Sequence, residues 1–335
     1  MIRPDTAYRS LSWSVGESEV PVSSADVVVT VAVLTFRRPD DLAEVLPLLV
    51  EQAAQAEIPG RRVEVLVVDN DPGAGARPAV ERLGLGRVRY VVEETPGISA
   101  ARNRALEEAD GSFLVFIDDD ERPRAGWLTR LLDTQARTGA AAVVGAVVSD
   151  FDGELDPWVR AGGFFERRRL VTGTPIAVAA TNNLLLDLGV VRSTGIRFDG
   201  DFGLTGGSDT LFTRQLTAAG HLMVWCDEAV VTDRVPAPRM SREWVVRRSF
   251  RYGNSATRVD LVLAPSGGAR GLARARAVVR GLPRLTLGLA RWMLGTVVQS
   301  AAHEARGLRT AARGAGMMAG AMGVAYAEYR RKAAA

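Results

Sequence analysis

Four acidic residues in a row follow an apolar stretch near the middle of the chain. Residues 113–117 read FLVFI, and Asp118, Asp119, Asp120 and Glu121 come directly after them. The stretch has the length and the aromatic and β-branched content of a strand buried on both faces. Asp118 and Asp120 lie on the same side of an extended chain, so together they could hold one hard divalent cation. The alternative is a solvated acidic turn leading into a helix that starts at Pro123.

The elements around this stretch predict a parallel sheet. We expect strands at residues 26–35, 63–69, 88–92, 113–117 and 141–148, with helices starting at residue 38, at 98–109 and at 127–138. Alternating strands and helices imply βαβ crossovers. Ligands of such sheets bind beyond the carboxyl ends of the strands. Thr35, Asp69 and the acidic stretch should therefore share one edge, unless each acid is only a turn residue at a strand end.

An arginine pair suggests what this edge could bind. Arg102 and Arg104 lie near the start of the helix behind Gly97, where guanidinium groups and the helix amino terminus could meet phosphate oxygens. Acids that hold a cation, together with a nearby arginine, describe a site for a nucleoside diphosphate. The GxxxxGK[ST] loop is absent, which argues against hydrolysis of a nucleoside triphosphate by that route.

Composition points to a globular cytosolic protein. Apolar residues make up 47% and charged residues 24% of the 335 positions, enough for a sizeable core. One cysteine and two histidines argue against disulfides and against metal sites built from those residue types. Residues 1–25 show no periodicity and no secretory signal, and we interpret them as an amino-terminal arm.

The second half of the chain is less regular. We interpret residues 149–174 as a loop over the site or a small insertion, followed by a helix near 187–193 and another at 210–219. Short strands are expected at 221–225 and 229–232, and a basic helix at 239–258.

The carboxyl-terminal segment carries the excess of positive charge. Residues 265–335 hold twelve Lys and Arg against two acids, so the first 264 residues have a net charge of −7. Because its uncharged stretches are shorter than a membrane-spanning helix requires, we expect a basic amphipathic extension lying on an anionic membrane surface. The alternative is a helical hairpin packed on the domain or on another protein. Few aromatic residues lie between its arginines, which argues against nucleic acid.

An ordered set of motifs resembles a known enzyme family. VLTFRRP, VVDND, GISAARNRAL, FIDDDERP, TNNLLL and FDGDFGLTGGSDTLF occur in this order within residues 26–258. The set is similar to the inverting glycosyltransferases of family 2, in particular to the succinoglycan-type exopolysaccharide glucosyltransferases. The resemblance implies a GT-A catalytic domain at 26–264, an α/β fold with a Rossmann-like mixed, mostly parallel sheet between helices. A basic helical extension would follow at 265–335.

The resemblance also implies a role for each matching residue, with Mg²⁺ or Mn²⁺ as cofactor. Asp209 would be the catalytic base, although from its position alone it would equally cap a helix. The donor nucleotide would be bound by Thr35, Phe36, Arg37, Asp69, Arg102, Asp118 and Asp119. The metal would be held by Asp120, Asp118 and Asp233, and the acceptor or phosphate region would contain Asn183, Gly207, Ser208, Arg239, Trp244 and Arg248.

Two positions depart from the family pattern. Ser208 stands where the family usually has a glutamate, and Asp233 stands where it often has a histidine metal ligand. The leading hypothesis is transfer of a sugar from a nucleotide diphosphate, with a UDP-sugar as the expected donor, to a lipid-linked or polysaccharide acceptor at the inner face of the cell membrane. The alternatives are nucleotidyl transfer and a non-catalytic subunit of a membrane complex that binds a nucleotide-sugar.

Overall fold

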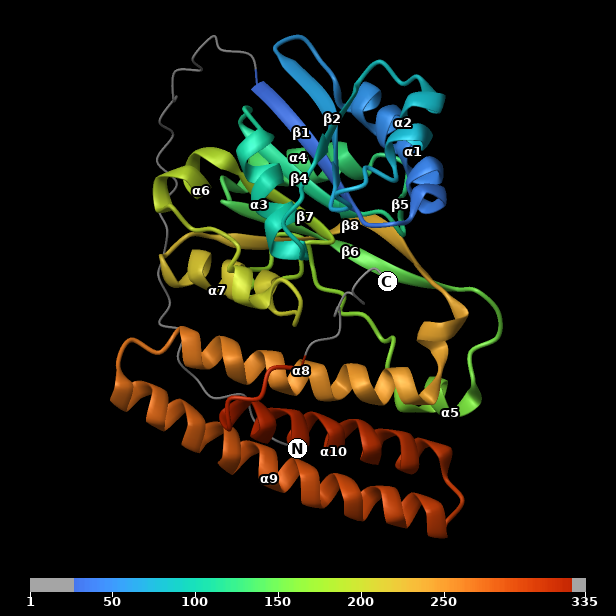
Figure 1. Cartoon of the computed structure of the whole chain (residues 1–335), viewed down its shortest axis with the longest axis vertical. Helices are drawn as coiled ribbons and strands as arrows, with labels where there is room; N and C mark the ends of the chain where they lie inside the picture. The colour runs from blue at the N-terminus through green and yellow to red at the C-terminus, as the bar shows by residue number, and fades with distance from the viewer. Residues whose placement is uncertain (1–26, 327–335) are drawn as a thin grey trace.

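The computed structural model describes residues 27–326. The predicted amino-terminal arm and residues 327–335 of the predicted extension lie outside the described residues. A twisted sheet with helices on both faces occupies one end of the molecule, and long helices form the other (Figure 1).

The amino-terminal half of the sheet is parallel, as the alternation of strands and helices predicted. β1 (Val27–Thr35) pairs with β2 (Arg61–Asp69) on one side and with β4 (Phe113–Asp118) on the other, and β3 (Val88–Val92) pairs with β2. The connecting helices are α1 (Pro39–Ala56), α2 (Arg77–Leu83) and α3 (Ile98–Glu108).

The second half makes the sheet mixed. The strand order is β3-β2-β1-β4-β7-β6-β8-β5. β7 (Asn183–Asp187) runs antiparallel to both β4 and β6 (Ala142–Phe151), whereas β8 (Met223–Val235) is parallel to β6. Of the described strand pairs, four are parallel and three antiparallel, so the expected mixed, mostly parallel sheet is confirmed.

The prediction of two separate strands near residue 225 was wrong. The strands expected at 221–225 and 229–232 form the single strand β8, whose pairing partner changes from Gly145 opposite Cys226 to Ala146 opposite Val230. A bulge absorbs the polar residues that seemed to interrupt the strand. The alternative in which Pro123 starts a helix is also wrong: Pro123 ends the short strand β5 (Glu121–Pro123), an edge strand where a missing N–H is tolerated.

The remaining helices lie around the sheet and below it. They are α4 (Trp127–Thr138), α5 (Pro157–Gly162), α6 (Leu188–Thr194), α7 (Ser208–Ala218), α8 (Arg242–Val262), α9 (Gly267–Val297) and α10 (Ala301–Ala321), with short 3₁₀ turns η1 (Gly200–Phe202) and η2 (Ala237–Met240). Residues 149–174, expected as a loop or insertion, contain the end of β6 and α5.

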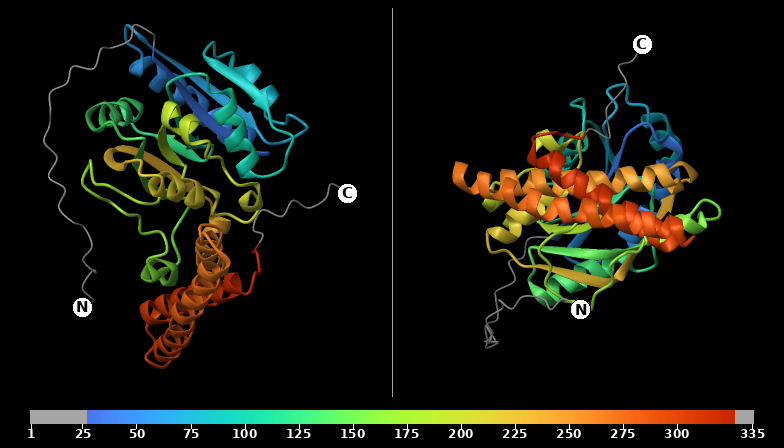
Figure 2. Two further views of the ribbon diagram at one scale, coloured as in Figure 1. Left: turned by 90° about the vertical axis from the view of Figure 1, so that its left-hand side faces the viewer. Right: turned by 90° about the horizontal axis from the view of Figure 1, so that it is seen from below.

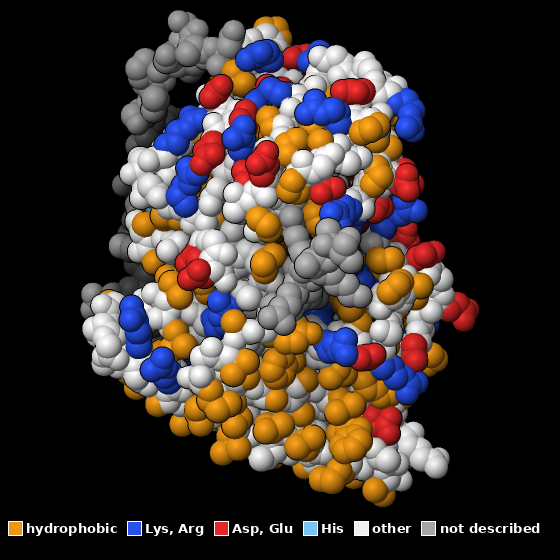
Figure 3. Space-filling model, viewed as in Figure 1, with side chains coloured by type: hydrophobic (Ala, Val, Ile, Leu, Met, Phe, Trp, Pro, Cys, Tyr) orange, Lys and Arg blue, Asp and Glu red, His pale blue; other side chains and the backbone are white. Residues whose placement is uncertain are grey.

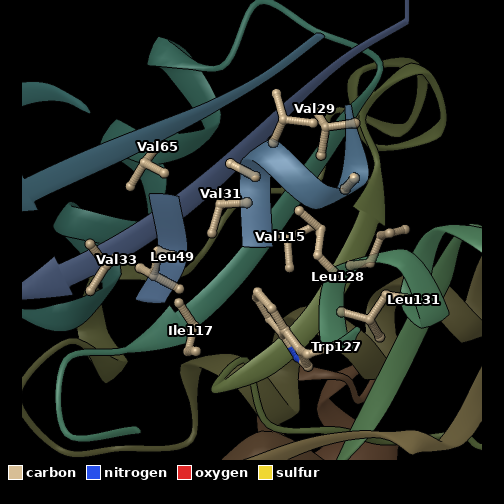
Figure 4. Packing of buried hydrophobic residues seen from close by; sticks show 14 of the residues in the cluster. Val29, Val31, Val33, Leu49, Val65, Val115, Ile117, Trp127, Leu128 and Leu131 are labelled. Carbon is tan, nitrogen blue, oxygen red and sulfur yellow. The ribbon is translucent and has the colours of Figure 1, made fainter. Parts of the chain in front are cut away.

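Alternating strand side chains supply two cores, one on each face of the sheet. Val29, Val31 and Val33 of β1 face α1 and α4, where Leu49 and Trp127 meet them (Figure 4). Ala32 and Leu34 point to the opposite face, toward α3, α6 and α7. Burial on both faces explains the continuous apolar composition of these strands, and it holds the ends of β1, β2 and β4 in a rigid frame.

Glycines bring the last three helices into close contact. α8 lies between the sheet and the pair formed by α9 and α10 (Figures 1 and 2). A Cβ on Gly253 would lie 2.0 Å from the carbonyl oxygen of Arg313, and one on Gly316 would lie 2.0 Å from that of Phe250. Gly316 and Gly253 therefore allow α10 and α8 to approach closely. Among the residues from 27 to 326, no helix is both long and apolar enough to cross a membrane.

Candidate active site

The carboxyl ends of β1, β2 and β4 meet at one edge, as expected. Thr35 lies opposite Asp69, and Leu34 lies opposite Asp118. The Thr35 hydroxyl donates a 2.8 Å hydrogen bond to Asp119 Oδ2, which joins the end of β1 to the acidic stretch. Parallel register and the lengths of the strands thus assemble the polar residues that the sequence spaces far apart.

Crowding of the carboxylates raises their pKa values. Burial, and then the neighbouring Asp120, raise the pKa of Asp118 to about 7, although its side chain keeps some contact with solvent. Burial raises the pKa of Asp119 to about 6. Burial, followed by Asp118 and Asp233, raises the pKa of Glu121 well above its usual range. Asp233 belongs to this cluster because it lies opposite Glu121 in the β5–β8 pair. A bound cation would relieve this repulsion.

Three arginines partly neutralise the acids. Arg38 Nη1 donates to Asp119 Oδ1 at 2.9 Å and to Asp120 Oδ2 at 3.0 Å, and Arg239 Nη1 donates to the same Asp120 oxygen at 2.9 Å. Arg167 pairs with Asp233. The sequence interpretation included Arg239 but missed Arg38 and Arg167. The only signals were the arginines after β1 and the Arg167–Arg169 run, and neither indicates a partner so distant in the chain.

The acids have the chemistry of a divalent metal site but are not closed into one. Among the described residues, no group of three or more His, Cys, Asp or Glu side chains is arranged to hold a metal ion. Within residues 27–326, neither carboxylate oxygen of Asp118 accepts a hydrogen bond, and only one oxygen of Asp120 does. The unbonded carboxylate oxygens are ligands that Mg²⁺ and Mn²⁺ accept. The residues therefore fit a hard divalent cation.

Asp69 lies at the carboxyl end of β2, as predicted, and is held by the loop that follows. Its side chain is fully buried. Oδ1 accepts a hydrogen bond from the Asp71 amide at 3.0 Å, while Oδ2 accepts from the Ala76 amide at 3.0 Å and from the Tyr90 hydroxyl at 2.6 Å. In this geometry both carboxylate oxygens of Asp69 hold the loop after β2, and its contact with a donor nucleotide stays a prediction.

Phe36 and Arg37 lie at the end of β1 beside that loop. The Arg37 guanidinium lies 5.1 Å from the centre of the Phe36 ring and pairs with Asp71 at 3.5 Å. Arg37 has a positive φ of 55°, a conformation that is uncommon for a non-glycine residue. This turn directs the chain away from the sheet, immediately before Arg38 reaches back to the acids.

Arg102 joins the acidic cluster to the loop that carries Asp209. Arg102 is buried, its positive charge lowers the pKa of Asp118, and its Nη1 donates to Ser208 Oγ at 2.6 Å. Asp209 follows Ser208 in the first turn of α7 and is half-buried, and its Oδ1 accepts a hydrogen bond from the Thr210 amide at 2.7 Å. Gly207, with φ 100°, permits the turn into this helix. Arg102 thus links the loop that carries Asp209 to the acidic strand ends.

The structure corrects the role expected for Asn183 in the acceptor region. Its side chain is buried in the core, where Nδ2 donates to the carbonyl oxygens of Ala146 and Ala229, both at 2.9 Å. Its Oδ1 accepts from Trp127 Nε1 at 2.8 Å. Because all its donors and acceptors are used in joining β6, β8 and α4, Asn183 does not belong to the acceptor region. The neighbouring Asn182, which the sequence interpretation missed, donates to Glu121 Oε1 at 2.5 Å.

Trp244 and Arg248 lie on α8 at the side of the site formed by residues 149–174. The Trp244 ring stacks on Phe165 with an interplanar angle of 2°. The Arg248 guanidinium lies 5.1 Å from the Trp244 ring centre and 5.7 Å from that of Phe165. Arg239, in η2, connects this side to the acids through Asp120.

Comparisons with known proteins agree with this geometry. The model of the family described as "Glycosyl transferase family 2" matches residues 30–193. The succinoglycan biosynthesis protein ExoM of Rhizobium meliloti is 37% identical over 235 residues, which cover 69% of this chain and 74% of that protein. This chain belongs to glycosyl transferase family 2. Glycosyltransferase AglE of Haloferax volcanii is a further relative of this glycosyltransferase, 26% identical over 69% of the chain and 73% of that protein.

A solved structure supports the fold. The mannosyltransferase PcManGT from Pyrobaculum calidifontis, determined with GDP-Man and Mn²⁺, aligns with a TM-score of 0.54 and 19% identity. The alignment covers 89% of this glycosyltransferase and 90% of that chain. The GT-A fold expected from the motifs is confirmed, and the protein is a glycosyltransferase.

Proposed function

We propose that this glycosyltransferase moves a sugar from a UDP-sugar to a hydroxyl group of a lipid-linked or polysaccharide acceptor, with inversion at the anomeric carbon. The observation that carries the proposal is the Arg102–Ser208 hydrogen bond, which joins the loop of Asp209 to the acidic strand ends. A donor diphosphate at the strand ends and an acceptor hydroxyl at Asp209 would then approach one another. The relative ExoM is named for the biosynthesis of a polysaccharide, succinoglycan, which supports this class of acceptor.

Asp118 and Asp120 would hold Mg²⁺ or Mn²⁺. Their unbonded oxygens are suited to it, and Asp233 could join them if Arg167 released it. Bound there, the ion would neutralise negative charge on the departing diphosphate. Arg38 and Arg239 hold Asp120 in place from one side, which leaves its second oxygen for the metal.

Asp209 would act as the general base. Inversion requires the acceptor hydroxyl to attack from the face opposite the leaving diphosphate, and a carboxylate on that face can take its proton. General base catalysis contributes a factor of about 10² to 10⁴ in rate. The family usually has a glutamate at position 208, which would pair with Arg102. Because Ser208 is neutral, the positive charge of Arg102 acts on Asp118 instead.

The donor nucleotide would lie along the ends of β1 and β2. Thr35, Phe36 and Arg37 border this region, and Asp119 is fixed there by the Thr35 hydroxyl. Asp69 would contribute indirectly, through the loop that it holds. Gly207, Ser208, Arg239, Trp244 and Arg248 would border the acceptor on the other side.

The extension would rest on an anionic membrane surface. In α9 the small residues are buried and large apolar side chains are exposed. Its buried positions include Gly281, Gly288 and Gly295, whereas Leu287 and Val297 are 69% and 80% exposed. Apolar side chains cover the end of the molecule where α9 and α10 lie (Figure 3). Contiguous exposed apolar surface marks a site of interaction, and the arginines of α9 could reach lipid headgroups. We therefore propose a catalytic domain at 26–264, a peripheral extension at 265–335 and a location at the cytoplasmic membrane face.

Release of UDP in the presence of acceptor tests the roles. A panel of UDP-sugars with Mn²⁺ identifies the donor. We expect Asp209→Asn to reduce turnover by about 10² to 10⁴, and Asp120→Asn to weaken activation by Mn²⁺. Asp133→Asn, at an exposed position on α4, serves as the control. If both site variants turned over like the wild type, the assignment would be wrong.

A further inference from the structure

An arginine on α8 is surrounded by aromatic rings instead of acids. The Arg248 guanidinium lies 5.1 Å, 5.2 Å and 5.7 Å from the ring centres of Trp244, Tyr252 and Phe165. Its Nε donates to the Tyr252 hydroxyl at 2.7 Å. Within residues 27–326, no carboxylate pairs with it. Aromatic faces hold a guanidinium in place but leave most of its donors unused.

Other positive charges make this position costly without an anion. Burial lowers the pKa of Arg248, and the neighbouring Arg167 and Arg251 lower it further. Arg167 has Asp233 as its partner, at the border of the acidic cluster. Arg248, Arg167 and Arg251 thus form a cluster of like charge, and a polyanion would relieve the repulsion between them.

The cluster borders the loop of the proposed base. A Cβ on Gly206 would lie 3.6 Å from Arg251 Cδ, and Gly206 is three residues before Asp209. Arg248 and Arg251 are three positions apart on α8 and so lie on one face of it. The cluster therefore extends from the loop of Asp209, beside Arg251, to Asp233, the partner of Arg167.

We infer that Arg248, with Arg167 and Arg251, binds a phosphate group carried by the acceptor. The inference rests on the proposed function, since it takes the Asp209 side of the site as the acceptor side. Guanidinium groups bind phosphate through paired hydrogen bonds, which Arg248 can offer because the rings fix its plane. The acceptor would then be a phosphate- or diphosphate-linked lipid, and a neutral polysaccharide would lack this contact.

Binding of a short prenyl diphosphate to the full-length protein tests the inference. Farnesyl diphosphate is titrated by calorimetry with UDP and Mn²⁺ at saturation, so that the donor region is filled. We expect Arg248→Gln to weaken its binding about 10-fold to 100-fold, because charged hydrogen bonds are lost. Arg247→Gln is the matched control, since Arg247 is exposed and pairs with Glu243. We expect Arg248→Lys, which keeps the charge but not the planar fork, to bind with intermediate affinity.

Further probes separate the possible sources of phosphate. Farnesol should not bind, and vesicles of phosphatidylglycerol should bind the wild type and Arg248→Gln equally, because the headgroup surface lies on α9. The inference is overturned if Arg248→Gln binds farnesyl diphosphate like the wild type while melting at the wild-type temperature. It is also overturned if farnesyl diphosphate binds only when UDP is absent. If UDP does not bind the wild type, the proposed donor site is refuted. In that case, titration of farnesyl diphosphate alone still measures binding to the arginine cluster.

Discussion

Replacing Gly316 by alanine should separate α10 from α8. The added Cβ would lie 2.0 Å from the Phe250 carbonyl oxygen and 2.8 Å from its carbonyl carbon. An ordinary contact begins at 3.4 Å, so the two helices would have to move apart by about 1.4 Å. Both atoms belong to backbone, and no side-chain rotation can relieve the clash.

The expected cost follows from two opposing effects. Overpacking a well-packed contact costs about 1–3 kcal/mol, whereas alanine gains about 1 kcal/mol over glycine inside a helix. We expect a net loss of about 0–2 kcal/mol in the free energy of unfolding, or up to roughly 8 °C in melting temperature. Gly271→Ala, on the exposed start of α9 with no atom within 4 Å of the new Cβ, should be neutral or stabilising.

Thermal and urea unfolding of the two variants measure the difference. Activity should fall with Gly316→Ala as well, because α8 also supports the loop before Asp209: Arg258 Nη1 donates to Thr205 Oγ1 at 2.5 Å. If Gly316→Ala melted at or above the temperature of Gly271→Ala, the close contact between α8 and α10 would not exist in solution, and the reasoning would be refuted.

Three further predictions concern the acids, the membrane and the core. Because burial raises the pKa of Asp118 to about 7, the folded protein retains a proton there that the unfolded chain loses near pH 4. Its free energy of unfolding without metal should therefore fall between about pH 4 and pH 7, and urea titrations of Asp118→Asn should lack part of this fall. Leu287→Glu should reduce co-sedimentation with anionic vesicles several-fold, and unchanged sedimentation would contradict the proposed membrane face of α9. Asn183→Ala should cost about 2–4 kcal/mol in urea unfolding with little change in the Kd of UDP, because it leaves Trp127 Nε1 and two carbonyl groups unpaired; a large loss of UDP affinity at unchanged stability would return Asn183 to the site.

Local patterns predicted most of the elements. The strand at 88–92 and the helix at 127–138 agree with the structure at both ends, because apolar periodicity and glycine punctuation are properties of neighbouring residues. Errors occurred where pairing outweighs local preference. The bulge in β8 and the strand that contains Pro123 exist only because other strands lie beside them.

The two adjacent asparagines show the limit of sequence reasoning at the site. Asn182, in the turn just before β7, donates to Glu121, whereas Asn183, the first residue of β7, is hydrogen-bonded in the core. Their types are identical, so only the register of β7 against β4 and β6 decides which one belongs to the site. Arg38 and Arg167 were missed for a related reason: their acidic partners are distant in the chain.

The sequence alone determined that acids end several strands of one parallel sheet, because the order of strands and helices leaves the carboxyl ends on the same edge. It also determined that the carboxyl-terminal segment is helical and basic. Only the tertiary structure decided which charges neutralise which acids, that Arg102 joins those acids to the loop of Asp209, and that α9 turns its glycines inward and its large apolar side chains outward. The physical reason is the same in each case: an ion pair or a buried face depends on distances between segments, and spacing along a chain does not contain those distances.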